Sequence, residues 1–394
     1  MIYNQKKLNR LSEVVLRLIF CALLIIFYSC SSKSMKFRYD GHIYIKVNFD
    51  DKIRGNFIYD TGAPMLVIDT LFYKKNPFRF KEIQFAEMGG VGNTMQTVKL
   101  VKDTIQYETK FGIEKSRYNI LMDLKNILGK NIDGIAGVES FDKKPHKINY
   151  ISKHISQVKK IKGFEKIIIE YDDYRIFVPI SIQINDSTKV VGKFLLDLGS
   201  NTTTLVKNSM NINSVKKINY ISRGGAGGES SGNTFYAEKL SIGKFIIKHF
   251  PIDMSKDTLG AMASNLYLGK IGNDLLDDFD VILDLPNKNL FLRPNKNFNK
   301  NPSFLFKGFS FIDRTDINQG WRVATIYEES DAYKSGLRIN DQITSINDKS
   351  VYSMDKVKIL QKLEPNQQLK IQILRDNEIL FFNFILNTFL VNEK

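Results

Sequence analysis

The sequence predicts a mainly-β protein of two similar lobes followed by a smaller α+β domain. Three observations predict this fold class: a repeated Asp-x-Gly loop, β-prone runs around both copies, and a different pattern after residue 302. Runs such as HIYIKVNFD (42–50) and KIIIEYDDYRIFVPISIQI (166–184) are rich in β-branched and aromatic residues and are broken by turn residues. Because long helical periodicity is scarce, these runs are expected to be short strands.

The N-terminus predicts a signal peptide over 1–29 and a tether over 30–38. Basic residues precede the uncharged run LIFCALLIIFY (18–28), which is shorter than the ~20 apolar residues that span a bilayer. The run ends in FYSCSS, which resembles a bacterial lipoprotein signal and implies that Cys30 is lipidated. The expected location is the cell envelope, lipid-anchored and facing the periplasm or the cell surface. Ordinary secretion or an uncleaved anchor is the alternative.

Composition excludes several classes of function. Among the 394 residues there are only two cysteines, Cys21 and Cys30, so the chain after Cys30 cannot form a disulfide framework, a thiolate zinc site or a cysteine nucleophile. The net charge is +15, but no basic stretch is interleaved with aromatic residues, and we expect no nucleic-acid partner. The four histidines show no metal-binding spacing, so no metal is expected, and no phosphate-binding glycine motif indicates a nucleotide cofactor.

An internal repeat organises the region before residue 298. Each copy has an apolar run ending in Asp-x-Gly, then a glycine cluster, then an apolar segment ending in Gly. These landmarks are FIYDTGAPMLVI (57–68), GGVGN (89–93) and IAG (135–137) in the first copy, and FLLDLGSNTTTLV (194–206), GGAGG (224–228) and KIG (270–272) in the second. The matched order and spacing predict two lobes, 39–158 and 159–298, with an internal pseudo-twofold axis.

The repeated loops point to acid–base chemistry at Asp60 and Asp197. An Asp that ends a buried strand ahead of Gly lies on a tight turn, where backbone N–H groups approach its carboxylate. A pseudo-twofold axis would bring the two carboxylates face to face, where they share one proton. A water held between them then meets a general base and a general acid.

The segments DTGA (60–63) and DLGS (197–200), with their glycine clusters, resemble the aspartic proteases, specifically the retropepsin-like, single-chain, two-lobe bacterial form. The resemblance implies two acid-protease β lobes and an endopeptidase that cleaves protein or peptide substrates without a cofactor, as a monomer. It implies catalytic roles for Asp60 and Asp197. The residues that it implies as loop support are Thr61, Gly62, Ala63, Gly199 and Ser200, and as flaps Gly89, Gly90, Gly92, Gly224, Gly225 and Gly227.

One departure from the family pattern concerns the second loop. Thr61 is expected to tie the two loops together, but Leu198 stands where the family usually has Thr or Ser, so the reciprocal bond cannot form. Ser200 can bond its neighbouring carboxylate, whereas Ala63 cannot. A missing hydrogen bond costs ~1 kcal/mol, which would loosen the pair without abolishing it. A non-catalytic, peptide-binding lipoprotein therefore remains the alternative function.

The C-terminal segment follows a linker expected over 291–302. WRVATIYEESDAYKSGLRINDQITSINDKSV (321–351) resembles a PDZ domain, with a helix that starts after Ser330 and stops at Gly336. The domain is expected over 304–390. The resemblance implies that Gly308 and Phe309, in KGFSF, receive the C-terminus of a peptide, and that the domain binds or positions protein substrates.

Overall fold

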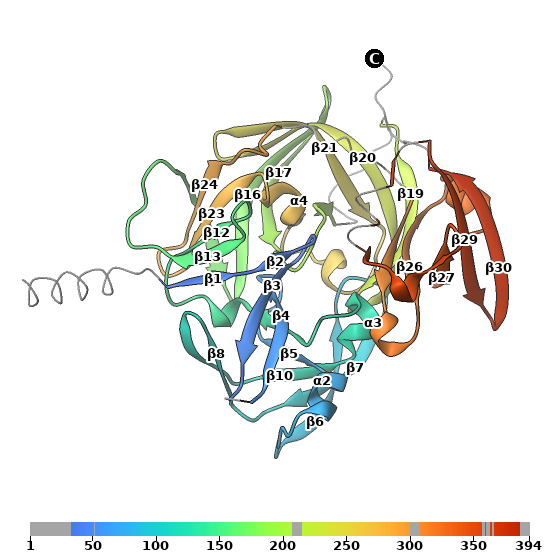
Figure 1. The fold of residues 1–394 in the computed structure, drawn as a ribbon. Coiled ribbons are helices and arrows are strands. Elements are labelled where there is room, and N and C mark those ends of the chain that lie inside the picture. The colour runs from blue at the N-terminus through green and yellow to red at the C-terminus, as the bar shows by residue number, and fades with distance from the viewer. Residues whose placement is uncertain are drawn as a thin grey trace, which may run out of the picture.

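The computed structural model describes residues 33–386, apart from positions 51, 207–214, 300–307, 357–358, 360–362 and 365. Strands dominate this part of the chain and form sheets of six, ten and fourteen strands. Figure 1 shows two strand-rich lobes, the first blue to teal and the second green to yellow, with the orange and red C-terminal domain beside them. The predicted mainly-β class with a small C-terminal domain is confirmed.

A six-stranded antiparallel sheet joins the two lobes, in the order β1-β13-β12-β23-β24-β14. Its strands are β1 (Ser34–Lys36), β12 (His146–Asn149), β13 (His154–Gln157), β14 (Glu165–Ile168), β23 (Phe279–Asp284) and β24 (Asn289–Pro294). The central pair, β12 and β23, has two further strands on each side. The sheet therefore has the symmetric order that a pseudo-twofold axis requires.

Two segments expected to be irregular belong to this sheet. The predicted tether is part of the fold from Ser34 on, because β1 pairs with β13 and the side chains of Met35 and Phe37 are buried in the core. The predicted linker overlaps β24, whose Leu290 and Leu292 are also buried. In the tether, apolar residues at alternate positions stabilise a strand that polar neighbours obscure in the sequence.

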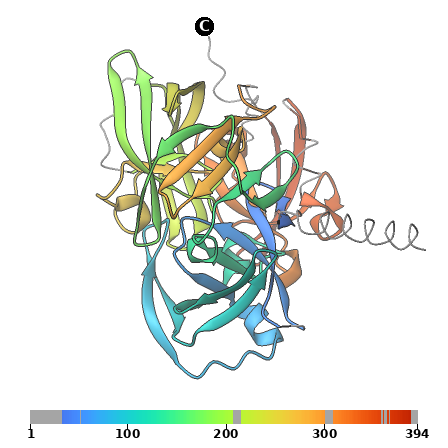
Figure 2. The same cartoon turned by 90° about the vertical axis from the view of Figure 1, so that its left-hand side faces the viewer.

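The first lobe is built on the ten-stranded sheet, which lies below the second lobe in the view of Figure 2. Its strands are β2 (Arg38–Tyr39), β3 (Ile43–Asn48), β4 (Arg54–Asp60), β5 (Leu66–Asp69), β6 (Ile83–Gly89), β7 (Met95–Val101), β8 (Ile105–Thr109), β9 (Gly112–Ser116), β10 (Asn119–Met122) and β11 (Gly134–Gly137). Short helices α2 (Thr70–Lys75) and α3 (Leu124–Leu128) and the 3-10 turn η1 (Val138–Ser140) connect them. The buried Asp69 accepts backbone hydrogen bonds at the start of both α-helices, which fixes them to β5.

The second lobe is a barrel, because β16 pairs with both β17 and β20 and so closes the ring β16-β17-β22-β18-β21-β20. Its strands are β15 (Glu170–Asp172), β16 (Arg175–Asn185), β17 (Thr188–Leu196), β18 (Thr204–Leu205), β19 (Ile218–Gly225), β20 (Gly228–Ile242), β21 (Phe245–Ser255) and β22 (Gly269–Ile271). Helix α4 (Asn273–Leu276) and the turn η3 (Ala261–Ala263) complete it. Closure leaves few unpaired backbone groups at the edges of this sheet.

The two lobes repeat the same strand pattern. In the first, β4 pairs parallel with β11, β11 antiparallel with β5, and β5 parallel with β10. In the second, β17, β22, β18 and β21 pair in the same order with the same directions. The sequence repeat therefore corresponds to a structural one.

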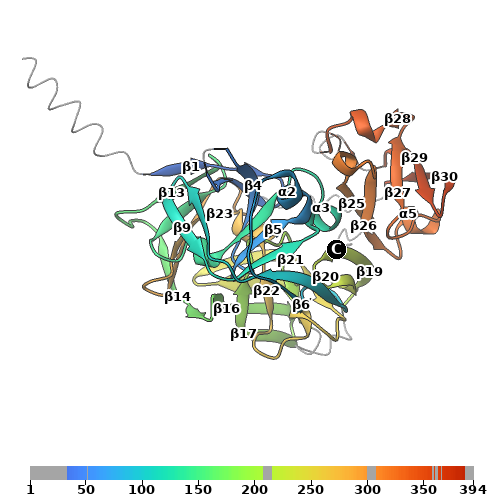
Figure 3. The same ribbon diagram turned by 90° about the horizontal axis from the view of Figure 1, so that it is seen from below.

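The C-terminal domain continues the sheet of the second lobe, because its strand β26 pairs with β19. Figure 3 shows this domain to one side of the two lobes. Its elements are β25 (Phe309–Asp313), η4 (Thr315–Ile317), β26 (Trp321–Tyr327), α5 (Asp331–Lys334), β27 (Gln342–Ile346), β28 (Lys349–Ser350), η5 (Val351–Ser353), β29 (Gln368–Arg375) and β30 (Glu378–Ile385). The expected helix is confirmed, since Ser330 caps α5 by accepting from the Tyr333 N–H.

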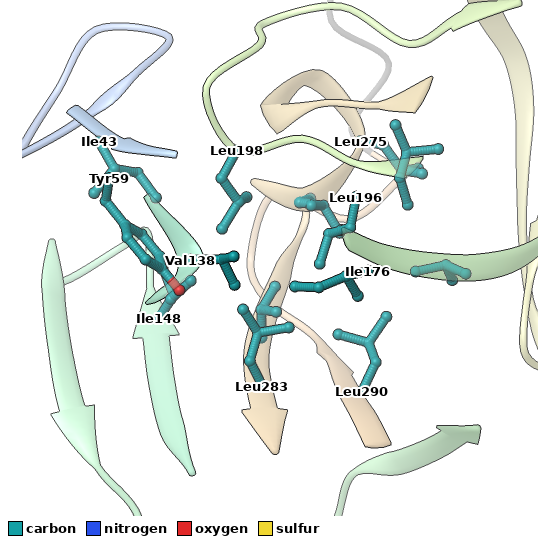
Figure 4. Packing of buried hydrophobic residues seen from close by; sticks show 14 of the residues in the cluster. Ile43, Tyr59, Val138, Ile148, Ile176, Leu196, Leu198, Leu275, Leu283 and Leu290 are labelled. Carbon is teal, nitrogen blue, oxygen red and sulfur yellow. The ribbon is translucent and has the colours of Figure 1, made fainter. Parts of the chain in front are cut away.

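One large hydrophobic core spans both lobes. Figure 4 shows Leu198 of the second Asp loop packed among Ile43, Val138 and Leu196, which come from both halves of the molecule. The loops that contain Asp60 and Asp197 therefore pack against one apolar core that both lobes share. In the part of the chain that the structure describes, no helix is both long and apolar enough for a membrane crossing.

Candidate functional site

Asp60 and Asp197 face one another across the boundary between the lobes. Asp60 ends β4, and Asp197 follows directly after β17. A Cβ atom on Gly62 would lie 2.6 Å from Asp197 Oδ1 and 3.2 Å from Asp60 Oδ1, so both carboxylates approach the same point. A Cβ on Gly199 would lie 2.2 Å from Asp60 Cγ. Both turns therefore need glycine, because any side chain there would displace the facing carboxylate.

Thr61 connects the two loops. Its hydroxyl, fully buried, donates to the Leu196 carbonyl at 2.7 Å and accepts from the Leu198 N–H at 3.0 Å. The Leu198 side chain is also fully buried but lies in the apolar core and offers no hydroxyl to the first loop. The link between the loops is thus made by one side chain, on the side of the first lobe.

The Asp60 carboxylate is held by its own turn. Its Oδ1 accepts from the Gly62 N–H at 2.7 Å and from the Ala63 N–H at 3.2 Å. Burial and then the nearby charge of Asp197 raise the pKa of Asp60 from 3.8 to about 7, although the two N–H groups and Lys270 oppose the shift. Near neutral pH, Asp60 therefore exists in both protonated and ionised forms.

The Asp197 carboxylate has a different partner, the ammonium group of Lys270. Lys270 Nζ lies 3.2 Å from Asp197 Oδ2, and the lysine side chain is 9% exposed. The prediction that Ser200 bonds its neighbouring carboxylate is wrong. The Ser200 hydroxyl instead accepts from Lys270 Nζ, because the ammonium lies beside Asp197, and it donates to the Thr202 carbonyl.

Sequence reasoning did not assign a role to Lys270, although a signal was present. Lys270 pairs with Leu195 between β22 and β17, as Ile135 pairs with Ile58 between β11 and β4. The second copy of the repeat therefore has lysine where the first has isoleucine. A charged residue at a buried repeat position is the feature that could have indicated this contact.

Two glycine-rich hairpins meet at their tips; hairpin A is β6–β7 and hairpin B is β19–β20. The Gly227 N–H donates to the Val91 carbonyl at 2.8 Å, and the Thr94 N–H donates to the Gly227 carbonyl at 2.9 Å. A Cβ on Gly90 would lie 2.7 Å from Ala226 Cβ, and one on Gly225 would lie 2.3 Å from the Val91 carbonyl. The tips approach closely because these positions lack side chains.

Only some of the predicted flap glycines lie at the contact between the two hairpin tips. Gly92 also belongs to it, since a Cβ there would lie 2.3 Å from the Gly227 carbonyl carbon. Gly89 ends β6 and lies against Met95 of its own hairpin. Gly224 lies in β19, and within the described residues an added Cβ would have no atom within 4 Å other than those of its own chain neighbours.

Asp257, which sequence reasoning also missed, fastens hairpin A to the second lobe. This fully buried carboxylate accepts from the Gly92 N–H at 3.1 Å and from the Asn93 side-chain amide at 2.9 Å. It also accepts from the Ser230 hydroxyl at 2.9 Å. Gly92 and Asp257 are separated by 165 positions in the chain, so only the tertiary structure brings them together.

Apolar clusters lie on the face of each lobe to which the carboxylates point. Ile58 precedes Asp60 by two residues in β4 and so shares its face of the strand, and Leu195 of β17 precedes Asp197 by two residues. Val91 of hairpin A packs against the cluster that contains Leu195, and Ala226 of hairpin B packs against the one that contains Ile58. Each hairpin tip thus reaches the wall of the opposite lobe, on the side of the Asp pair.

The predicted peptide-binding residues of the C-terminal domain have separate roles. Gly308 has φ +72°, and a Cβ there would lie 2.4 Å from the Ser330 side chain, so glycine is required. The Phe309 side chain is buried in the domain core. At the other end of β25, the Asp313 carbonyl accepts from the Lys130 N–H of the first lobe at 2.7 Å, which fixes β25 to that lobe.

The remaining predictions concern the lipidation site and metal binding. Cys30 and the signal peptide lie outside the described residues. Within the described ranges, no group of three or more His, Cys, Asp or Glu side chains is placed to hold a metal ion.

Comparison with known proteins identifies the C-terminal domain. Residues 308–386 match the family model of the PDZ domain. The chain therefore carries a PDZ domain, as predicted. The strands β25 to β30 and helix α5 lie within the matched residues. A search of curated proteins finds no match to this chain.

Proposed function

We propose that the two lobes form an aspartic-type endopeptidase whose catalytic residues are Asp60 and Asp197. The observation that carries this proposal is the approach of both carboxylates to one point, on equivalent turns of two similar lobes. Two hairpins that meet on the side of the pair support the same proposal, since such hairpins can close over an extended peptide.

The different partners of the two carboxylates suggest their roles. The ammonium of Lys270, 3.2 Å from Asp197, favours the negative charge of the pair on Asp197. Asp60, with its pKa raised to about 7, then carries the shared proton. Asp197 takes a proton from the attacking water, while Asp60 donates one to the carbonyl oxygen of the peptide bond. When the C–N bond breaks, Asp197 gives its proton to the leaving amine, and Asp60 takes back a proton from a hydroxyl group of the tetrahedral intermediate, so both carboxyl groups return to their starting states.

The apolar walls indicate the kind of peptide that fits. Clusters around Ile58 and Leu195 flank the carboxylates on both lobes. Side chains on either side of the cleaved bond would be buried against these clusters, at ~25 cal/mol per Å2 of apolar surface. The substrate is therefore a flexible segment of protein with apolar residues around the cleaved bond, and hairpins A and B must separate to admit it.

The test is peptide hydrolysis by the purified full chain. Asp60→Asn and Asp197→Asn should each lower kcat by at least ~100-fold, because each removes a general acid or base. Asp69→Asn is a matched control, since it alters a buried carboxylate away from both the pair and the hairpin tips. Wild-type rates in either Asp60→Asn or Asp197→Asn would show that the pair is not catalytic.

A peptide-binding protein without hydrolysis is the second candidate, and Leu198 favours it. Leu198→Thr offers a hydroxyl to the first loop and tests whether that missing bond limits activity. If the wild-type chain binds flexible peptides but cleaves none between pH 3 and 8, while the Leu198→Thr variant is equally inert, the binding function is correct.

The PDZ domain suggests peptide binding, and we propose that it binds or positions protein substrates at Gly308 and Phe309. We also propose that a lipid on Cys30 holds the protein to a membrane of the cell envelope. A Cys30→Ser variant should then move from the membrane fraction to the soluble fraction, and retention in the membrane would contradict lipid anchoring.

A further inference from the structure

A cavity of about 580 Å3 lies where hairpin A, hairpin B, the first lobe and the PDZ domain meet. Thr97 and Lys99 line it from hairpin A, Arg223 from hairpin B, and Arg314 and Arg322 from the PDZ domain. It belongs neither to the Asp pair nor to the predicted carboxylate loop at Gly308. Its lining includes four cationic side chains and a single carboxylate, that of Asp123.

Two of these arginines are buried without complete hydrogen bonding. Arg314 is 9% exposed and Arg322 is 5% exposed. The Nε atoms of both have no hydrogen-bond partner within the described part of the chain. Leaving a buried donor of a charged group unpaired costs more than the ~1 to 3 kcal/mol of a neutral one. A ligand that accepts from these donors would remove this cost.

The partners that the arginines do have are neutral. Arg314 Nη1 donates to the Asn126 side-chain oxygen. Arg322 Nη2 donates to the Ile127 carbonyl at 3.2 Å, and its Nη1 contacts the Asn340 side-chain oxygen at 3.4 Å. These contacts orient the two guanidinium groups without neutralising them, so their charges remain available to a ligand.

The arginines also repel one another. Burial, and then the charges of Arg314 and Arg223, together lower the pKa of Arg322 to about 10. Burial likewise lowers the pKa of Arg314, with Asp123 opposing the change and Arg223 adding to it. Like charges held close in a buried place are normally compensated by an anion.

We infer that this cavity is an anion-binding site for a small ligand with at least two acceptor oxygens, of the carboxylate or phosphate class. Guanidinium groups present several N–H donors in a planar fork that matches such oxygens. An anion bound by Arg223, Arg314 and Arg322 connects hairpin B to the PDZ domain. The inference does not depend on peptidase activity, because none of these side chains belongs to the Asp pair.

The test measures binding of inorganic phosphate and of succinate to the purified full chain by calorimetry at low ionic strength. The two anions distinguish a phosphate ligand from a carboxylate one. Wild type should bind at least one of them saturably. Arg223→Gln should bind about tenfold more weakly or worse, since a hydrogen bond to a charged group contributes ~1.5 to 3 kcal/mol.

Arg79→Gln is the matched control, because Arg79 is exposed and lies outside the cavity lining. Arg322→Gln should abolish binding. If that variant does not fold, the exposed Arg223 still decides the question, because its replacement leaves the buried residues in place. The inference is overturned if neither anion binds wild type saturably, or if Arg223→Gln binds as tightly as Arg79→Gln.

Discussion

The loop after β4 and the loop after β17 occupy equivalent places in the two lobes but hold their carboxylates differently. Asp60 accepts two backbone N–H groups, whereas Asp197 is paired with the ammonium of Lys270. Thr61 of the first loop makes the cross-link, whereas Leu198 of the second fills the core. The repeat thus places the two carboxylates at equivalent positions. The side chains that differ between the lobes give them different charged neighbours and different packing.

The largest expected effect comes from removing the packing of the second loop. Leu198→Ala should lower the free energy of unfolding by ~2 to 5 kcal/mol, because the side chain is fully buried between the lobes. Chemical denaturation measures this change. Leu198→Met conserves the volume and should cost less than ~1.5 kcal/mol. Equal losses in the two variants would contradict a packing role.

The cross-link of the first loop should be the next most sensitive feature. Thr61→Val removes the hydroxyl that links the Leu198 N–H to the Leu196 carbonyl and should cost ~1 to 3 kcal/mol. Denaturation midpoints and kcat should both fall. Thr61→Ser keeps the hydroxyl and should retain most of the stability. A Thr61→Ser variant as unstable as Thr61→Val would argue against the cross-link.

Replacing the lysine makes the second loop resemble the first. Lys270→Ile introduces the residue found at the equivalent position, Ile135, and removes the ion pair with Asp197. We expect kcat to fall ~10- to 100-fold, since a hydrogen bond to a charged group contributes ~1.5 to 3 kcal/mol. The pH profile of kcat should change as well. Lys270→Arg keeps the charge, so an unchanged profile in both variants would exclude this positioning role.

The last and smallest predicted effect is the change in wild-type activity for each unit of pH. Because the folded protein raises the pKa of Asp60 above its ordinary 3.8, the proton needed by the general acid is lost as pH rises through about 7. Activity on a neutral peptide should therefore decrease about tenfold per pH unit well above 7. A constant rate from pH 7 to 9 would contradict the assignment of Asp60 as the acid.

Much of the fold could be predicted because its signals are local. The glycine turns after Asp60 and Asp197, the strand runs and the Ser330 cap each depend on a few neighbouring residues. Strands whose sequence mixes polar and apolar residues could not be predicted in this way. The strand β1 was expected to be a tether, because only pairing with β13 reveals that Met35 and Phe37 face the core.

The site was less predictable where it depends on distant contacts. Lys270 reaches Asp197 across 73 positions, and Asp257 reaches Gly92 across 165. Ser200 was expected to bond a carboxylate, but the ammonium that Lys270 brings occupies that place. Spacing along the chain does not carry this information, because burial and charge neighbours are set by packing.

The sequence by itself determined the mainly-β class, the duplicated Asp loops and the PDZ domain, since each is written in local periodicity, turn residues and a repeat. The tertiary structure decided which groups meet: the two hairpin tips, Lys270 with Asp197, β19 with β26, and the arginines of the cavity. The physical reason is that desolvation and Coulomb energies depend on distances in space, whereas backbone preferences act between neighbours in the chain.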